Sequence, residues 1–257
     1  MLTGQQMNIG IVQFDIDWEN KKKNQEMVHE LVDTSESGSN IDWIIFPEMT
    51  LTGFSMNTRI TELATGDGHI FGDIAKQYQA YVTYGGVLNG KNCSITLDKN
   101  GDVINEYSKL HLFSYAGEDQ HYTPGKKQTS FSISGMRITP MICYDLRFAY
   151  LYWDKAPETD VYVVIASWPA SRILHWRTLL QARAIENQAY VIGVNRIGSD
   201  PKNSYCGNSL VIDPMGNIVL DCDDREGLFI ANIDRNLVTE TRSKFPFQKD
   251  RKKIDIS

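Results

Sequence analysis

The residue with the greatest chemical potential in this sequence is Cys143, in the segment MICYDLRF. It stands where the apolar run 138–142 gives way to polar and charged residues, as at the junction of a strand and a turn. A cysteine at a strand end can be held rigidly by the sheet while its sulfur faces a cleft. A buried core cysteine is the alternative, because free cysteines are among the most buried residues. The choice depends on whether the chain supplies a base and a positive charge.

Glu48 and Lys109 could supply the two groups that a reactive thiol needs. Glu48 follows the apolar run 43–46 and a proline, so it would be held stiffly at a strand end. Lys109 lies in an apolar and aromatic segment and not in a run of charges. A carboxylate can take the thiol proton, and a fixed lysine can stabilise a developing oxyanion. Singly, a loop carboxylate and a snorkelling lysine explain these residues at least as well, but the three together favour catalysis.

Apolar, β-branched runs predict the strands that would position these groups. Strands are expected over residues 8–14, 43–46, 82–88, 130–133, 137–142, 161–166, 190–194, 209–212, 218–220 and 228–233. Helices are expected over residues 18–33, 70–81 and 171–188. The pairs Asn89-Gly90, Asn100-Gly101 and Ser134-Gly135 predict hairpin turns. Strands with intervening helices imply a layered α/β architecture with more than one sheet.

Length and organisation favour one compact domain. The chain has 257 residues, with no Pro- or Ser-rich linker and no repeat of solenoid period. We expect a single domain over residues 1–257, with a core over about 7–234 and a C-terminal tail over about 235–257. Met7 is as acceptable a natural start as Met1.

Charge and cysteine content argue against several classes of protein. The net charge of −6 argues against a general nucleic-acid or anionic-membrane binder. No apolar run is long enough to span a bilayer and no secretory signal is visible, so a cytoplasmic location is expected. The four cysteines lack metal-ligand spacing, so no zinc or other metal site is expected, and free thiols suit a reducing compartment. These cysteines are Cys93, Cys143, Cys206 and Cys222.

The motifs around the three reactive residues resemble those of the carbon–nitrogen hydrolase (nitrilase) superfamily. Glu48 in FPEM, Lys109 in YSKLHLF and Cys143 in ICYDLRF follow the order of that superfamily. The likeness continues through SWPA and ARAIENQ, and it is greatest to the ω-amidase branch, including its bacterial members. The resemblance implies a four-layer αββα sandwich, in which two sheets pack together under helices. It also implies that neither a metal nor an organic cofactor is needed.

The resemblance further assigns roles to residues of this chain. It implies that Glu48 is the general base and Cys143 the nucleophile, while Lys109 and the backbone N–H of Tyr144 stabilise the tetrahedral intermediate. Glu118, in the segment AGEDQHYTPG, matches a second glutamate that orients the lysine and helps to place the attacking water. An amide would then form a thioester on the cysteine with loss of ammonia, and water would hydrolyse it.

The ω-amidase branch acts on small 2-oxo dicarboxylic acid monoamides, such as 2-oxoglutaramate and 2-oxosuccinamate. Such a substrate carries a carboxylate far from the amide, so a cationic clamp is expected. Arg172 is the candidate clamp, with a surface arginine at a helix start as the alternative, and Arg147 is assigned a structural role. Phe113, Tyr115 and Trp168 are candidate walls of the pocket.

Two kinds of alternative keep the fold and change the function. With the same site, the alternatives are a deaminated-glutathione amidase, a nitrilase and an N-carbamoyl amine hydrolase. A noncatalytic binding protein is expected to lack one of the three reactive residues, yet all three are present. His111 and His175 are expected to be structural. A homodimer is expected through helices near the nucleophile, with Trp168, Trp176 and residues 183–186 as candidate contacts.

Overall fold

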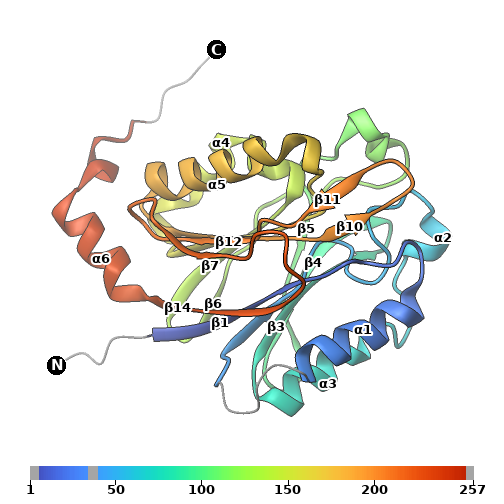
Figure 1. Cartoon of the computed structure of the whole chain (residues 1–257). Coiled ribbons are helices and arrows are strands. Elements are labelled where there is room, and N and C mark those ends of the chain that lie inside the picture. The colour runs from blue at the N-terminus through green and yellow to red at the C-terminus, as the bar shows by residue number, and fades with distance from the viewer. Residues whose placement is uncertain (1–5, 34–39, 253–257) are drawn as a thin grey trace.

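The computed structural model describes residues 6–33 and 40–252. Within these residues the chain forms two six-stranded sheets and a short two-stranded hairpin (Figure 1). Each helix in the same residues is too short or too polar to cross a membrane. Met1, one of the two candidate starts, and the last part of the expected tail lie outside the described residues.

The first sheet has a parallel centre and antiparallel edges. Its order is β14-β1-β2-β3-β4-β5, with β1, β2 and β3 parallel to one another. The predicted turns Asn89-Gly90 and Asn100-Gly101 join β3 to β4 and β4 to β5. The strands are β1 (Gln6–Gln13), β2 (Trp43–Ile45), β3 (Tyr81–Leu88), β4 (Lys91–Leu97), β5 (Val103–Ser108) and β14 (Gly227–Asp234).

The second sheet repeats this plan. Its order is β13-β12-β9-β8-β7-β6, with β7, β8 and β9 parallel. Every residue of β8 is buried, as the continuous apolar run at 161–166 predicts for a strand covered on both faces. The strands are β6 (Phe131–Ile133), β7 (Met136–Ile142), β8 (Val161–Ala166), β9 (Tyr190–Asn195), β12 (Leu210–Ile212) and β13 (Ile218–Asp221).

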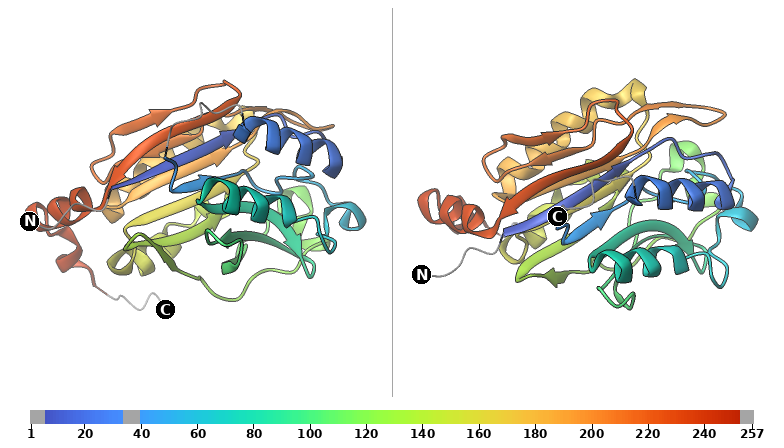
Figure 2. Two further views of the ribbon diagram at one scale, coloured as in Figure 1. Left: turned by 90° about the horizontal axis from the view of Figure 1, so that it is seen from below. Right: turned by 60° about the horizontal axis from the view of Figure 1, so that its bottom comes forward.

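Helices cover the outer face of each sheet (Figures 1 and 2). The first sheet is covered by α1 (Lys21–Asp33) and α3 (His69–Tyr78), and the second by α4 (Ala149–Lys155) and α5 (Ile173–Asn187), whereas α2 (Thr58–Thr61) and α6 (Arg235–Lys244) lie at the ends of the sandwich. Val28 of α1 and Phe71 of α3 lie in the apolar layer between these helices and the first sheet. Trp176 of α5 lies in the corresponding layer on the second sheet. Between the sheets, Ile9 of β1 and Ile138 of β7 share a third apolar layer. The predicted αββα sandwich is therefore confirmed.

The segments that leave four strands bring the candidate residues to one place. In the first sheet, β2 leads to Glu48 and β5 to Lys109. In the second sheet, β7 leads to Cys143 and β8 to Ser167. The packing of one sheet on the other therefore determines how the candidate base and nucleophile meet.

Two elements do not follow from the hydrophobic pattern. The hairpin β10 (Ile197–Ser199) and β11 (Ser204–Cys206) is polar and contains Pro201, so it lacks the alternation that marks a strand. Helix α6 is also polar and lies in the segment expected to be a tail. It is held instead by Arg242, whose guanidinium donates to the carbonyls of Gln188 and Thr159 at 3.0 and 2.6 Å.

The expected dimer contacts need one correction. Trp168, Trp176 and Arg183 are buried in the interior of their own chain, at 3%, 0% and 5% exposure. Arg183 donates to the Leu146 carbonyl at 2.9 Å. These three side chains cannot reach a partner, whereas Ile185 in the same segment is exposed.

Candidate active site

Glu48, Lys109 and Glu118 form a buried, hydrogen-bonded cluster. Lys109 Nζ donates to Glu48 Oε1 at 2.9 Å and to the Glu118 carboxylate at 2.9 and 3.1 Å. All three side chains are excluded from water. The cluster holds two carboxylates but only one ammonium, and an unbalanced buried charge costs free energy. Such an arrangement is typical of a functional site and not of a stabilising ion pair.

The backbone around Glu48 holds its carboxylate toward the second sheet. Glu48 Oε2 accepts a hydrogen bond from the backbone N–H of Ser167 at 2.8 Å, across the boundary between the sheets. The loop also packs directly on Gly85 of β3. A Cβ at position 85 would lie 2.4 Å from Met49 N and 2.7 Å from Glu48 Cα, so only glycine fits there. The Glu48 carboxylate, the candidate base, is therefore fixed from both sheets.

Cys143 lies on a sharp turn at the end of β7. Its φ is +44°, in the left-handed region that side chains with a Cβ seldom adopt. The buried Asp145 holds this turn. It accepts hydrogen bonds from the Ile142 N–H at 3.2 Å, from the Tyr107 hydroxyl at 2.7 Å, and from His111 Nδ1 at 3.0 Å. The strained backbone presents the sulfur to a cavity.

Burial and the neighbouring charges set the ionisation of the site. Burial raises the pKa of Cys143 well above its usual value, the Glu48 carboxylate raises it further, and the Lys109 ammonium only partly opposes them. The thiol is therefore protonated at neutral pH and needs a base to become a nucleophile. Burial alone would lower the pKa of Lys109, but the Glu118 and Glu48 carboxylates raise it, so the ammonium stays charged.

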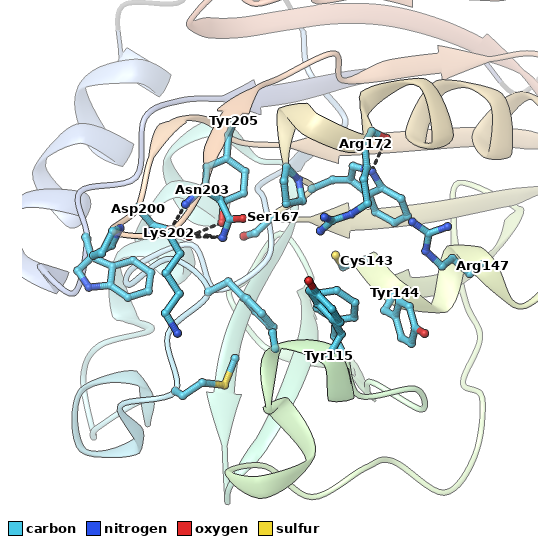
Figure 3. Close-up of a pocket in the computed structure, with 18 residues that line it drawn as sticks. Tyr115, Cys143, Tyr144, Arg147, Ser167, Arg172, Asp200, Lys202, Asn203 and Tyr205 are labelled. Carbon is cyan, nitrogen blue, oxygen red and sulfur yellow. Dashed lines mark hydrogen bonds between the residues drawn. The ribbon is translucent and has the colours of Figure 1, made fainter.

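A cavity of about 380 Å³ opens above Cys143 (Figure 3). Phe113, Tyr144 and Trp168 line it, as does Arg172. The apolar side chains of Trp18, Phe54 and Met56 also line it. The cavity is mostly apolar with a few charged groups, which is typical of a small-molecule site.

Cationic groups dominate the charge of the cavity. Arg147 and Arg172 lie beside Cys143, and Lys202 lies on the opposite side in the view of Figure 3. The Asp200 carboxylate is the one acidic side chain among the residues that line the cavity, and it is engaged by the backbone N–H groups of Lys202 and Asn203 and by the Tyr205 hydroxyl. The cavity is therefore suited to an anionic ligand.

The two arginines are held by aromatic rings and not by carboxylates. The Arg147 guanidinium lies 4.9 Å from the Trp168 ring centroid, and the Arg172 guanidinium lies 5.7 Å from that of Phe113. Arg147 also donates to His175 Nδ1 at 3.2 Å. Among the described residues neither arginine has a carboxylate within ion-pair distance, so both guanidinium groups remain available to a ligand.

The structure brings together the site residues that the sequence predicts. Glu48, Lys109 and Glu118 form the cluster, and Cys143 lies at the adjacent cavity. Arg172, Trp168, Phe113 and Tyr144 line the cavity, with Tyr115 beside them. His111 has the predicted structural environment, since it bonds Asp145 and stacks on Phe148.

Three further features were not predicted. Asn92, in the middle of β4, donates to both carboxylates of the cluster. Arg147, assigned only a structural role from the sequence, lines the cavity because the turn after Cys143 directs it there. The tip of the β10–β11 hairpin, with Asp200 and Lys202, closes one side of the cavity. None of these residues directly follows an apolar run, the signal that drew attention to Glu48 and Cys143.

Across the part of the chain that the structure describes, no group of three or more His, Cys, Asp or Glu side chains is arranged to hold a metal ion. The reactive groups identified here are instead one thiol, two carboxylates and one ammonium. That donor set suits acid–base and nucleophilic chemistry.

Comparisons with known proteins place this geometry in a family. The carbon-nitrogen hydrolase model matches residues 8–243. The 2-oxoglutaramate amidase of Bacillus subtilis (strain 168) is 32% identical, with 95% of this chain and 97% of the relative covered. The Omega-amidase YafV of Escherichia coli (strain K12) is 38% identical, with 81% and 84% covered.

A solved structure agrees with this match. A CN-hydrolase superfamily protein from Xanthomonas campestris, with an arsenic adduct in its active site, has a TM-score of 0.90 to this chain at 27% identity. The alignment covers 98% of this chain and 99% of that protein. From the family match, the two relatives and this shared architecture, we conclude that the chain belongs to the carbon–nitrogen hydrolase family.

Proposed function

We propose that this protein is an ω-amidase. It hydrolyses the terminal amide of small 2-oxo dicarboxylic acid monoamides, 2-oxoglutaramate and 2-oxosuccinamate, to the acid and ammonia. The observation that carries this proposal is the position of Cys143 beside the Glu48–Lys109–Glu118 cluster, in a cavity whose arginines lack carboxylate partners. The names of the relatives from Bacillus subtilis and Escherichia coli support the same substrate class.

In the first half of the reaction, Cys143 is the nucleophile and Glu48 the general base. Glu48 takes the thiol proton as the sulfur–carbon bond forms at the amide carbon. The oxyanion develops near the Lys109 ammonium and the backbone N–H of Tyr144. Glu48 then passes the proton to the leaving nitrogen, the carbon–nitrogen bond breaks, and ammonia leaves a thioester on Cys143.

In the second half, water replaces ammonia. Glu48 takes a proton from the water as its oxygen attacks the thioester carbon, and it returns the proton to the departing sulfur. Glu118 holds Lys109 in place through both of its oxygens. It also helps to place the attacking water. The acid is released and the thiol is restored.

Substrate recognition relies on the cationic part of the cavity. Arg172 binds the distant carboxylate of the substrate, and Arg147 adds a second guanidinium on the same side of Cys143. Phe113, Tyr144 and Trp168 enclose the short carbon chain. Charged hydrogen bonds to a carboxylate are stronger than neutral ones, so they distinguish a monoamide acid from a neutral amide.

Hydrolysis of a panel of amides tests this function, measured as ammonia from primary amides and as the released amine from substituted amides. We expect turnover of 2-oxoglutaramate and 2-oxosuccinamate in preference to deaminated glutathione, nitriles and N-carbamoyl amines. Cys143→Ala and Glu48→Gln serve as matched controls, because each should remain folded and lose at least about 10²-fold in kcat. A preference for any compound outside the monoamide acids would refute the ω-amidase assignment.

One observation favours deaminated glutathione as a second candidate substrate. In Figure 3 Lys202 lies across the cavity from Arg147 and Arg172, so the cavity extends beyond what a short monoamide contacts near the arginines. A bulkier amide with a charged end could occupy this additional space. The same panel distinguishes it, because a higher kcat/KM for deaminated glutathione than for 2-oxoglutaramate would select it.

We also propose that the enzyme is a cytoplasmic homodimer that acts on small molecules and not on nucleic acid or membranes. All four cysteines are free thiols, and a reducing compartment keeps such thiols available. The outer face of α5 supports the dimer, because Leu174 and Ile185 expose apolar surface there, at 72% and 52% exposure.

A further inference from the structure

Asn92 occupies the centre of the carboxylate cluster although it carries no charge. Its Nδ2 donates to Glu48 Oε1 at 2.8 Å and to Glu118 Oε1 at 2.9 Å. Its backbone carbonyl also accepts the N–H of Lys109 at 2.8 Å. One residue of β4 therefore contacts Glu48, Glu118 and Lys109, all of which have a role in the proposed reaction.

The hydrogen bonds of Asn92 and Lys109 close a ring. Asn92 Nδ2 and Lys109 Nζ each bridge the same two oxygens, Glu48 Oε1 and Glu118 Oε1. Both donors are buried, so the ring is protected from exchange with water. An amide nitrogen has two N–H groups, and here each engages a different carboxylate.

This ring distinguishes the two oxygens of Glu48. Oε1 accepts two hydrogen bonds, whereas Oε2 accepts one, from the Ser167 N–H. Ser167 follows β8 and lines the same cavity as Cys143, so its N–H holds Oε2 on the side of the thiol. Oε2 therefore keeps a lone pair for the proton of Cys143.

We propose that Asn92 is a positioning residue, which fixes Glu48 and Glu118 with one N–H each and so makes Glu48 Oε2 the proton acceptor. The proposal rests on the proposed role of Glu48 as the base. Asparagine suits the position because lysine would neutralise the cluster and aspartate would add a third carboxylate. Serine would supply only one of the two donors.

The test is the pH dependence of kcat/KM for Asn92→Ala and Asn92→Asp. A carboxylate that loses an N–H donor is a stronger base, because that hydrogen bond favours the charged form. The acid limb of the Asn92→Ala profile should therefore move to higher pH by about one to two units. The shift should be larger for Asn92→Asp, and kcat should fall more than about tenfold with KM little changed, since Asn92 does not line the cavity.

Asn105→Ala is the matched control. Asn105 is a buried asparagine on the neighbouring strand β5, outside the cluster. The Asn105→Ala variant should leave the acid limb of the pH profile unchanged, because among the described residues no hydrogen bond joins Asn105 to the cluster. If Asn92→Ala lowers the unfolding midpoint but keeps the wild-type pH profile, Asn92 is only structural and the proposal is wrong.

A second readout separates this proposal from the choice of substrate. The rate at which iodoacetamide alkylates Cys143 reports proton transfer to Glu48 without any amide substrate. Its acid limb should shift in Asn92→Ala as that of kcat/KM does. If the wild-type protein hydrolyses no amide in the panel, the ω-amidase proposal fails, while an alkylation shift still supports Asn92. An unshifted alkylation profile overturns the role of Asn92 whatever the substrate.

Discussion

Cys143 differs from a cysteine that is activated by a permanent positive partner. Burial is the largest influence on its pKa, and the nearby Glu48 carboxylate acts in the same direction. Lys109 cannot reverse this, because its charge is shared between Glu48 and Glu118. In the proposed reaction, the thiolate of Cys143 is therefore produced by proton transfer during attack and is not present beforehand.

This ionisation can be measured directly. We predict that the native protein shows no thiolate ultraviolet absorbance from Cys143 below pH 9, the usual pKa of a thiol. The folded state then binds a proton that the unfolded chain releases above pH 9, so stability should decline as pH rises beyond that value. A difference titration of the wild type against Cys143→Ala checks this. A thiolate that titrates near neutral pH and disappears in the variant would contradict it.

At the scale of elements, the site depends on loops that follow strands and on one close approach between them. The loop with Glu48 packs on β3 at Gly85, where a Cβ would meet backbone atoms at 2.4 and 2.7 Å. The backbone cannot yield as a flexible side chain would. A side chain at position 85 must therefore move Glu48.

We predict that Gly85→Ala lowers kcat by about 10²-fold, since a displacement of about 1 Å in a catalytic group has such an effect. The variant should also lose about 1–3 kcal/mol of unfolding free energy through overpacking. Gly72→Ala, in helix α3, is the matched control, because its Cβ would meet atoms no closer than 3.9 Å. It should keep full activity and gain slightly in stability. Steady-state kinetics measures kcat of both variants, and urea unfolding measures their free energies of unfolding.

The elements also explain what the sequence could and could not predict. The strands and their ends could be predicted because a buried strand appears in the sequence as one contiguous β-branched run. Glu48 and Cys143 lie at the ends of such runs. The role of Asn92 could not be predicted, because the residues next to it in the strand do not indicate its hydrogen-bond partners. Those partners, Glu48 and Glu118, are distant in the sequence. The orientation of Arg147 depends on the strained turn at Cys143, which no local pattern specifies. The site therefore required both the motifs and the tertiary fold.

At the scale of the whole molecule, the sandwich leaves apolar surface on one helical layer. Leu174 and Ile185 are eleven positions apart on α5, which places them on one face of the helix. Both are largely exposed, whereas the opposite face packs on the second sheet through Trp176 and Leu180. This face is where we expect a second copy of the chain to bind.

We predict a mass in solution of twice the 29.2 kDa of one chain. Leu174→Asp and Ile185→Asp, combined, should reduce that mass to the monomer value, because a buried unpaired carboxylate opposes association. Val103→Asp, at an exposed position on β5, is the control and should leave the dimer intact. Light scattering after size-exclusion chromatography measures all three. A monomeric wild type would exclude the dimer.

The division of the site between the two sheets has a consequence for the life of the chain in a cell. Glu48, Asn92 and Lys109 belong to the first sheet, and Cys143 and Ser167 to the second. In a nascent or partly unfolded chain, in which only one sheet has formed, Glu48, the proposed base, and Cys143 are not brought together. Incompletely folded chains, which are the substrates of chaperones and proteases, should therefore have no amidase activity. Amide hydrolysis then reports the number of completely assembled molecules, and not the amount of polypeptide.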